Sequence, residues 1–235
     1  MAIRMFSIIL TLILFCGSVS ADDCVILLHG LGRTSRSMRT LEKELEKGGY
    51  LVVNESYPSR KHGIKNLTGF VGDGIAQCRK HGVRNIHFVA HSLGGILVRN
   101  YFQTNVVPEA GRVVMLGPPN HGSEVADKYK NRYWFRKFTG PAGQEVGTGP
   151  DGIPNKLKPV PLEIGIIAGT ESLDPWFSGV VPKPNDGKVS VANTRLAEMK
   201  DFITVAHSHA FLCSSKAVIR QVKHFLSQGN FEHNP

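Results

Sequence analysis

Several signals that mark large protein classes are missing from this 235-residue sequence. It shows no Gly-x-y period, heptad or solenoid repeat, which excludes collagen, coiled coils and repeat arrays. A hydrophobic content of 41% and a charged content of 20% exclude a wholly disordered chain. What remains is a length sufficient for one buried core, within the usual size of a single α/β domain.

Metal-binding motifs are also missing. There is no Cys-x-x-Cys and no His-Glu-x-x-His pattern, so we expect neither a metal site nor a cofactor. The 28 basic and 19 acidic side chains give a formal net charge of +9, which favours anionic partners such as lipid headgroups. Peripheral contact with an anionic membrane is therefore compatible with the charge. No nucleic-acid-binding motif accompanies it, so we expect no nucleic-acid partner.

Residues 1–21 have the pattern of an export signal. Arg4 precedes an apolar stretch over residues 6–15, and residues 19–21 are small enough for signal-peptidase cleavage. A retained membrane anchor is the alternative, although the stretch is shorter than the ~20 residues of a spanning helix. We expect an exported protein that is periplasmic or secreted. Association with the membrane is the alternative. Its domain, residues 22–235, keeps 27 basic and 19 acidic side chains, a net charge of +8.

Three cysteines follow the predicted signal, namely Cys24, Cys78 and Cys213. An exported protein can join two of them in a disulfide. The odd number leaves at least one cysteine free or in an intermolecular bond, and the sequence does not decide which.

From residue 24 onward, short aliphatic and β-branched runs alternate with longer amphipathic stretches. The runs predict strands over residues 25–28, 51–54, 86–90, 112–116, 164–168 and 202–205, and the amphipathic stretches predict helices over 37–47, 67–81, 93–103 and 215–227. This alternation predicts an α/β fold whose mostly parallel sheet is covered by helices on both faces. Ligands of such folds bind at the carboxyl ends of the strands.

The alternation lapses over residues 119–161, which we interpret as a lid-like insertion. Its centre, residues 128–138, interleaves basic and aromatic side chains, as would suit a cap at a lipid–water interface. The alternative is a short helix that packs Trp134 and Phe138 onto the core while its charges face water. The sequence leaves both interpretations open.

The most informative residues are AHSLGG, at positions 90–95, between a predicted strand and a predicted helix. A nucleophilic serine at such a turn is held in a strained conformation, and close packing admits only small residues two positions before and after it. Ala90 and Gly94 meet this demand, although the commoner pattern has Gly at the first position. We therefore predict that Ser92 is a nucleophile, and the alternative is an idle serine in a Gly-rich turn.

A serine nucleophile needs a base and preorganised donors for the oxyanion. The HGLG segment, residues 29–32, ends the first predicted strand. It would place the backbone N–H of Leu31 beside that of Leu93, the residue after the nucleophile, so these two form the predicted oxyanion hole. His29 is interpreted as a structural residue that orients the loop.

HGLG near the amino terminus and AHSxGG at the nucleophile make the chain similar to exported bacterial lipases and esterases of the α/β-hydrolase fold. The likeness to these triacylglycerol-lipase-like proteins extends over nearly all of residues 24–230. It implies a Ser, Asp, His triad in that chain order.

The stretch PNDGKVSV, residues 184–191, resembles the loop that supplies the triad aspartate in such lipases. The resemblance therefore implies Asp186 as the acid. Asp174, nearer the end of its strand, is the competitor. An ordinary Asn-Asp-Gly turn would use the same residue types without any catalytic task.

The base is expected before the last helix, where AHSHAFL, residues 206–212, contains two histidines. His209 precedes a small and an aromatic residue, as in the family, and is favoured over His207. Related lipases often hold calcium through an aspartate just beyond the histidine. Residues 210–213 contain no carboxylate, so we expect no such metal here.

Together these residues predict a serine carboxylic-ester hydrolase, a lipase or esterase, that cleaves acyl esters through an acyl-enzyme. The insertion makes lipid esters plausible substrates. An acyltransferase or phospholipase that uses the same triad is one alternative. A non-catalytic lipid-binding homologue is another, and it would not need an activated nucleophile.

Overall fold

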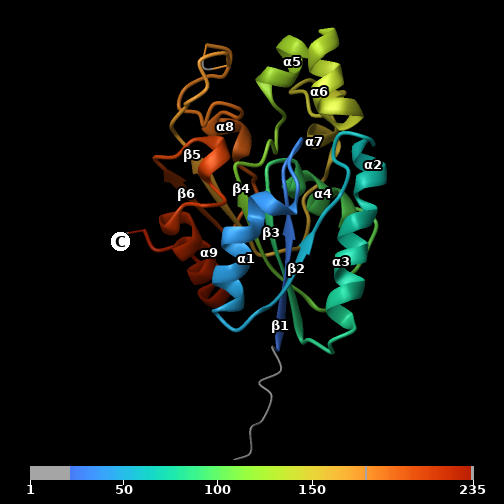
Figure 1. Ribbon diagram of the computed structural model, residues 1–235, viewed down its shortest axis with the longest axis vertical. Coiled ribbons are helices and arrows are strands. Elements are labelled where there is room, and N and C mark those ends of the chain that lie inside the picture. The colour runs from blue at the N-terminus through green and yellow to red at the C-terminus, as the bar shows by residue number, and fades with distance from the viewer. Residues whose placement is uncertain (1–21, 178, 234–235) are drawn as a thin grey trace, which may run out of the picture.

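The computed structural model describes residues 22–177 and 179–233, and the predicted export signal lies outside them. Six strands form one sheet in the order β2-β1-β3-β4-β5-β6, and every neighbouring pair is parallel (Figure 1). The strands are β1 (Asp23–Leu28), β2 (Leu51–Glu55), β3 (Asn85–His91), β4 (Ala110–Leu116), β5 (Ile164–Gly169) and β6 (Asp201–Val205). The predicted α/β fold with a mostly parallel sheet is confirmed.

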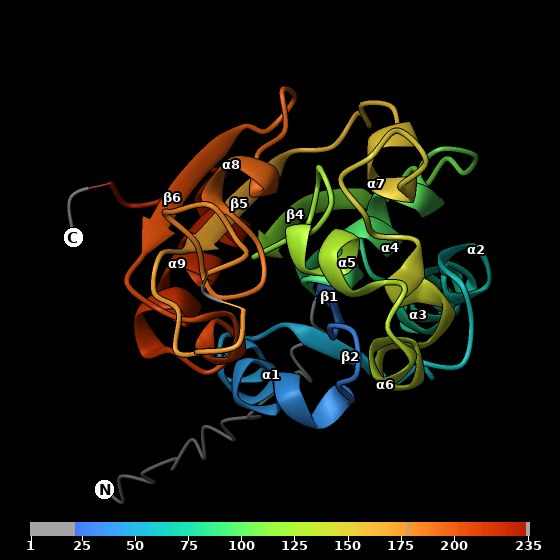
Figure 2. The ribbon, with the colours of Figure 1, turned by 90° about the horizontal axis from the view of Figure 1, so that it is seen from above.

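Helices cover both faces of this sheet. The α-helices of the described residues are α1 (Arg39–Glu46), α2 (Ile64–Leu67), α3 (Gly69–Arg79), α4 (Leu93–Tyr101), α5 (Glu124–Tyr129), α6 (Tyr133–Gln144), α7 (Ile153–Lys156), α8 (Val191–Thr194) and α9 (Lys216–Gln228). Helices α1 and α9 pack on one face, and α3 and α4 on the other, as Figure 2 shows. No helix in the described part of the chain is both long and apolar enough to span a membrane.

The interior strand β1 shows why the apolar runs fold as buried strands. Successive side chains of a strand point to opposite faces, so Cys24, Ile26 and Leu28 join the core beneath α3 and α4. Val25 and Leu27 join the second core, beneath α1 and α9. All five side chains are fully buried, which explains a continuous hydrophobic run rather than a polar–apolar alternation.

The helix predicted over residues 67–81 is divided differently in the structure. The segment forms two helices, α2 (Ile64–Leu67) and α3 (Gly69–Arg79), so helical structure begins earlier than predicted. Glu145 of the insertion accepts a hydrogen bond from the backbone N–H of Ile64 at 2.6 Å and so stabilises the first turn of α2. That contact spans more than eighty residues of sequence, beyond the reach of a local pattern.

The cysteine pairing that the sequence left open is Cys24 with Cys78. This disulfide joins β1 to α3 across the sheet face. Cys213, the remaining cysteine of the described residues, is buried as a free thiol.

The insertion at residues 119–161 forms α5, α6 and α7, which lie beyond the carboxyl ends of the strands (Figure 1). In α6, Phe135 is the buried aromatic, at 6% exposure, whereas Trp134 and Phe138 are 42% and 61% exposed. The interpretation that Trp134 and Phe138 pack onto the core is therefore wrong. A helix that follows a turn at Arg132 presents Phe135 to the core instead, and its role as a lid stays a prediction.

Candidate active site

Ser92 lies at the sharp turn between β3 and α4 with φ 54° and ψ −119°. Among the described non-glycine residues it alone has a positive φ. Such a conformation costs about 1–3 kcal/mol and persists only where the surroundings enforce it. Here close packing does so, because a Cβ on Gly94 would lie 2.6 Å from the carbonyl oxygen of Leu28. The backbone N–H of Ser92 also donates to the carbonyl of Leu116, at 2.9 Å, which holds the turn against β4.

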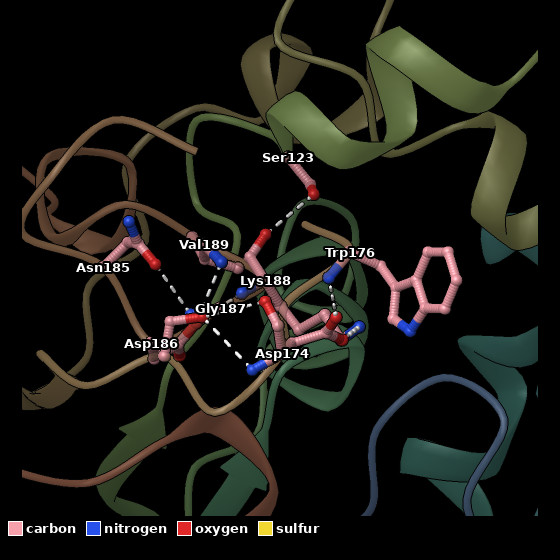
Figure 3. A network of polar contacts seen from close by, with 9 residues as sticks. Ser123, Asp174, Trp176, Asn185, Asp186, Gly187, Lys188 and Val189 are labelled. Carbon is pink, nitrogen blue, oxygen red and sulfur yellow. Dashed lines mark hydrogen bonds and ion pairs between the residues drawn. The ribbon is translucent and has the colours of Figure 1, made fainter. Parts of the chain in front are cut away.

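Asp186 and His209 are joined directly. The Nδ1 atom of His209 lies 2.6 Å from Oδ2 of Asp186, and the backbone N–H of His209 donates to the Asp186 carbonyl at 2.9 Å. The other carboxylate oxygen of Asp186, Oδ1, accepts the backbone N–H groups of Lys188 and Val189, both at 2.9 Å (Figure 3). The structure thus brings together an imidazole and a carboxylate from loops 23 residues apart.

The ionisation of Asp186 follows from these contacts. Burial at 2% exposure by itself raises the pKa of this carboxyl group. Attraction to His209 and the hydrogen bonds from His209, Val189 and Lys188 outweigh burial, so the pKa is lowered below its ordinary value. The carboxylate therefore stays charged at neutral pH and fixes Nδ1 of His209 as the protonated nitrogen.

Ser92 and His209 line one cavity of about 360 Å³. In the described residues no hydrogen bond joins the Ser92 hydroxyl to the His209 ring. Such bonds are often long in enzymes without substrate and shorten when the substrate binds. The cavity lies beneath α5 and α6 and is mainly apolar, with walls from Leu31, Val125, Ala126, Trp134, Phe135, Phe138, Val146 and Phe177.

The two predicted oxyanion donors belong to residues of the same cavity. Leu93 is the first residue of α4, so its N–H is one of the four that lack an acceptor within the helix. Leu31 follows β1 in the loop of residues 29–32 and also lines the cavity. The positive end of the α4 dipole lies at Leu93, which favours negative charge there. The oxyanion role of both residues stays a prediction.

The chain matches no family model and no curated protein. Among solved structures, lipase BlEst2 from Bacillus licheniformis in its mature form is 18% identical, with a TM-score of 0.74 over 89% of this chain and 92% of that one. An extracellular α/β-hydrolase from a Paenibacillus species is 15% identical, with a TM-score of 0.55 over 86% of this chain and 98% of that one. Phospholipase PlaB from Legionella pneumophila is 20% identical, with a TM-score of 0.54 over 74% of this chain and 45% of that one.

The chain has the α/β-hydrolase fold. At these identities the likeness shows the fold alone, and the activities named above are those of the neighbours. In an α/β hydrolase the nucleophile turn, the acid loop and the histidine loop meet at the carboxyl edge of the sheet. In this chain Ser92 follows β3, Asp186 lies in the segment after β5 and His209 follows β6, and their assignment to these three roles stays a prediction.

The two competing site residues have other partners in this structure. His207 Nε2 lies 2.7 Å from the hydroxyl of Ser215, which caps the N-terminus of α9. Asp174 Oδ2 lies 2.5 Å from the ammonium of Lys188 (Figure 3). Neither residue contacts the partner that a triad would require, so both are held in structural interactions instead.

His29 also has a structural environment. Its Nδ1 lies 2.9 Å from the carbonyl of Gly30, its Nε2 accepts the backbone N–H of Tyr57 at 3.3 Å, and its ring stacks on that of Tyr57. Burial lowers the pKa of His29, which keeps the imidazole neutral. These contacts orient the loop that carries Leu31, in line with the sequence interpretation.

Sequence reasoning missed His91, which precedes Ser92, the predicted nucleophile. Its ring packs on that of His209 with centroids 4.6 Å apart, and its Nε2–H donates to the His209 carbonyl at 3.0 Å. Burial, reinforced by repulsion from His209, lowers the pKa of His91 to about 3. A neutral His91 therefore supports the backbone of His209. The position of His91 next to Ser92 in the motif was the one sequence signal for a role near the site. The alternation of side chains along the strand does not reveal that its hydrogen-bond partner is His209.

Proposed function

We propose that this protein is a serine carboxylic-ester hydrolase that cleaves acyl esters, with lipid esters as the substrate class. The observation that carries the proposal is the strained Ser92 in one cavity with the His209 imidazole, which is bonded to Asp186. A strained serine beside a base held by a carboxylate is the arrangement that activates a hydroxyl nucleophile.

In the proposed reaction His209 takes the proton of the Ser92 hydroxyl as its oxygen attacks the acyl carbonyl. Asp186 holds the imidazole in the correct tautomer and stabilises the imidazolium that forms. The N–H groups of Leu31 and Leu93 would stabilise the oxyanion, and each donor of this kind typically contributes ~3 to 4 kcal/mol. His209 then passes the proton to the leaving alcohol, and water attacks the acyl-enzyme with His209 again as base.

The lipid substrate class rests on the apolar cavity beneath α5 and α6. Its aromatic and aliphatic walls suit an acyl chain rather than a polar group. The exposed aromatic side chains of α6 and the basic residues around them would also suit peripheral contact with an anionic membrane. The Cys24–Cys78 disulfide supports a location in an oxidising compartment, outside the cytoplasm.

The test replaces the nucleophile. We expect Ser92→Ala to lower kcat for a short acyl ester by roughly 10⁴-fold or more, because the remaining groups cannot form an acyl-enzyme. Ser227→Ala, at an exposed serine of α9, is the matched control and should keep the activity of the parent. A fluorophosphonate probe should label the parent and Ser227→Ala but not Ser92→Ala. Undiminished hydrolysis by folded Ser92→Ala would exclude the proposed nucleophile.

A further inference from the structure

Two depressions meet at His209, the proposed base. One is the apolar cavity described above, which we call the acyl cavity. The second, the outer groove, is about 420 Å³ and lies beside it between the Asp174 loop and the 3-10 helix His209–Phe211. Three residues, Arg33, Lys188 and His209, line both depressions. An ester held at Ser92 can therefore place its acyl chain in the cavity and its alcohol in the groove.

The accessible charge of the outer groove is positive. Its two carboxylates already have partners, since Asp186 is buried against His209 and Asp174 lies 2.5 Å from the Lys188 ammonium. The residue Arg33 is exposed, and within residues 22–177 and 179–233 no carboxylate lies within 4.0 Å of its guanidinium. A groove with one uncompensated cation is complementary to an anionic group on the bound molecule.

The position of Arg33 relates that cation to the reaction. It follows Gly32 in the loop that carries Leu31, so its main chain is tied to the predicted oxyanion donor. A guanidinium presents a planar fork of N–H donors that matches the oxygens of a phosphate, with two parallel hydrogen bonds. Beyond Arg33 the groove is flanked by the largely exposed side chains of Trp176 and Phe211, which can contact the carbon skeleton of an alcohol.

We infer that the outer groove binds the leaving alcohol and that Arg33 selects alcohols carrying a phosphate, so the substrates are acyl esters of the acylglycerol-phosphate type. The inference rests on the proposed function. In the reaction the Ser92 oxygen bonds to the acyl carbon and the ester C–O bond breaks. The Ser92 proton passes through His209 to the departing oxygen. The phosphate is bound by Arg33 and is chemically unchanged in the released alcohol.

The test compares two soluble esters with the same acyl chain, 1-butyrylglycerol and 1-butyrylglycerol 3-phosphate. They differ only in the phosphate, and both are too short to need a lipid surface. We expect the parent to hydrolyse the phosphate ester with a kcat/KM about tenfold higher at low salt, equivalent to about 1.4 kcal/mol of transition-state stabilisation. Added salt should reduce that preference, because the groove is open to solvent.

Three variants test whether Arg33 causes the preference for the phosphate ester. Arg33→Gln should lose it while still hydrolysing butyrylglycerol, and Arg33→Lys should keep part of it because the charge remains without the fork. Arg36→Gln removes the same charge three residues along the chain, at an exposed position outside both depressions, and should keep the preference. Thermal midpoints of all variants report whether each one folds.

The outcomes separate this inference from the function on which it rests. Equal kcat/KM for the two esters with the parent, or an unchanged preference in Arg33→Gln, would overturn the role of Arg33 and leave the hydrolase intact. A preference that does not respond to salt would overturn the electrostatic basis. Hydrolysis of neither ester, together with no fluorophosphonate labelling of Ser92, would remove the proposed function itself.

Discussion

The floor and the roof of the acyl cavity are built in opposite ways. The floor consists of turns at the ends of buried strands, where Ser92 is strained into place and His209 is held from behind by Asp186, whose two carboxylate oxygens both accept hydrogen bonds. The roof consists of α5 and α6, where Trp134 and Phe138 stay partly exposed. The difference teaches that the groups proposed for chemistry are fixed by many contacts, whereas the groups proposed for chain recognition are free to adapt to their ligand.

The largest loss of activity is expected from a change of Asp186, the carboxylate that contacts His209. Asp186→Asn should lower kcat by roughly 10⁴-fold, because an amide favours the wrong tautomer of His209. Asp174→Asn is the matched control, since this carboxylate pairs with Lys188 rather than with the imidazole. We expect it to keep activity within a few fold in the same ester assay. If Asp174→Asn were inactive and Asp186→Asn active, Asp174 would be the catalytic acid and the proposed role of Asp186 would be wrong.

Acidic pH should lower the free energy of unfolding, because His91, beside Ser92, is buried in its neutral form. The pKa of His91 is about 3 in the folded protein, because of burial and then repulsion from His209, against about 6.5 in an unfolded chain. Between these values the unfolded chain binds a proton that the folded protein does not, so the free energy of unfolding falls as the pH drops from 6.5 towards 3. Burial lowers the pKa values of His29 and His87 in the same direction.

Urea unfolding across this pH range measures the effect. His91→Gln should show a weaker pH dependence than the parent, whereas His62→Gln, at an exposed histidine, should show the same dependence as the parent. Stability of the parent that stays constant from pH 7 to pH 4 would contradict the buried neutral imidazole.

A smaller effect is expected from the roof. Trp134→Ala and Phe138→Ala remove apolar wall from the acyl cavity and should lower kcat/KM for a twelve-carbon ester by roughly tenfold each. Hydrolysis of a four-carbon ester should change much less, since a short chain does not extend to α6. Tyr133→Ala removes a neighbouring exposed aromatic that lies outside the cavity. If Tyr133→Ala lowers kcat/KM for the twelve-carbon ester as much, the aromatic residues of α6 act through their exposure on the surface and not as walls of the acyl cavity.

The strands and the nucleophile turn could be predicted because their causes are local. Apolar runs such as residues 25–28 mark strands buried on both faces, and Ala90 with Gly94 leave room for a serine in a strained turn. The pattern of α6 was harder, since aromatic residues at adjacent and helical spacings offer two possible buried sides. It is the packing against the rest of the domain that buries Phe135 and leaves Phe138 at the cavity.

The sequence by itself determined the parallel α/β architecture and a short set of candidate residues, because hydrophobic periodicity and turn chemistry act over a few neighbouring positions. Only the tertiary structure decided that His209 rather than His207 contacts Asp186, that Cys24 bonds to Cys78, and that Arg33 lines the outer groove with no carboxylate of the described residues within 4.0 Å of its guanidinium. These outcomes depend on contacts between distant segments, and such contacts form only when the whole sheet positions the loops at its edge.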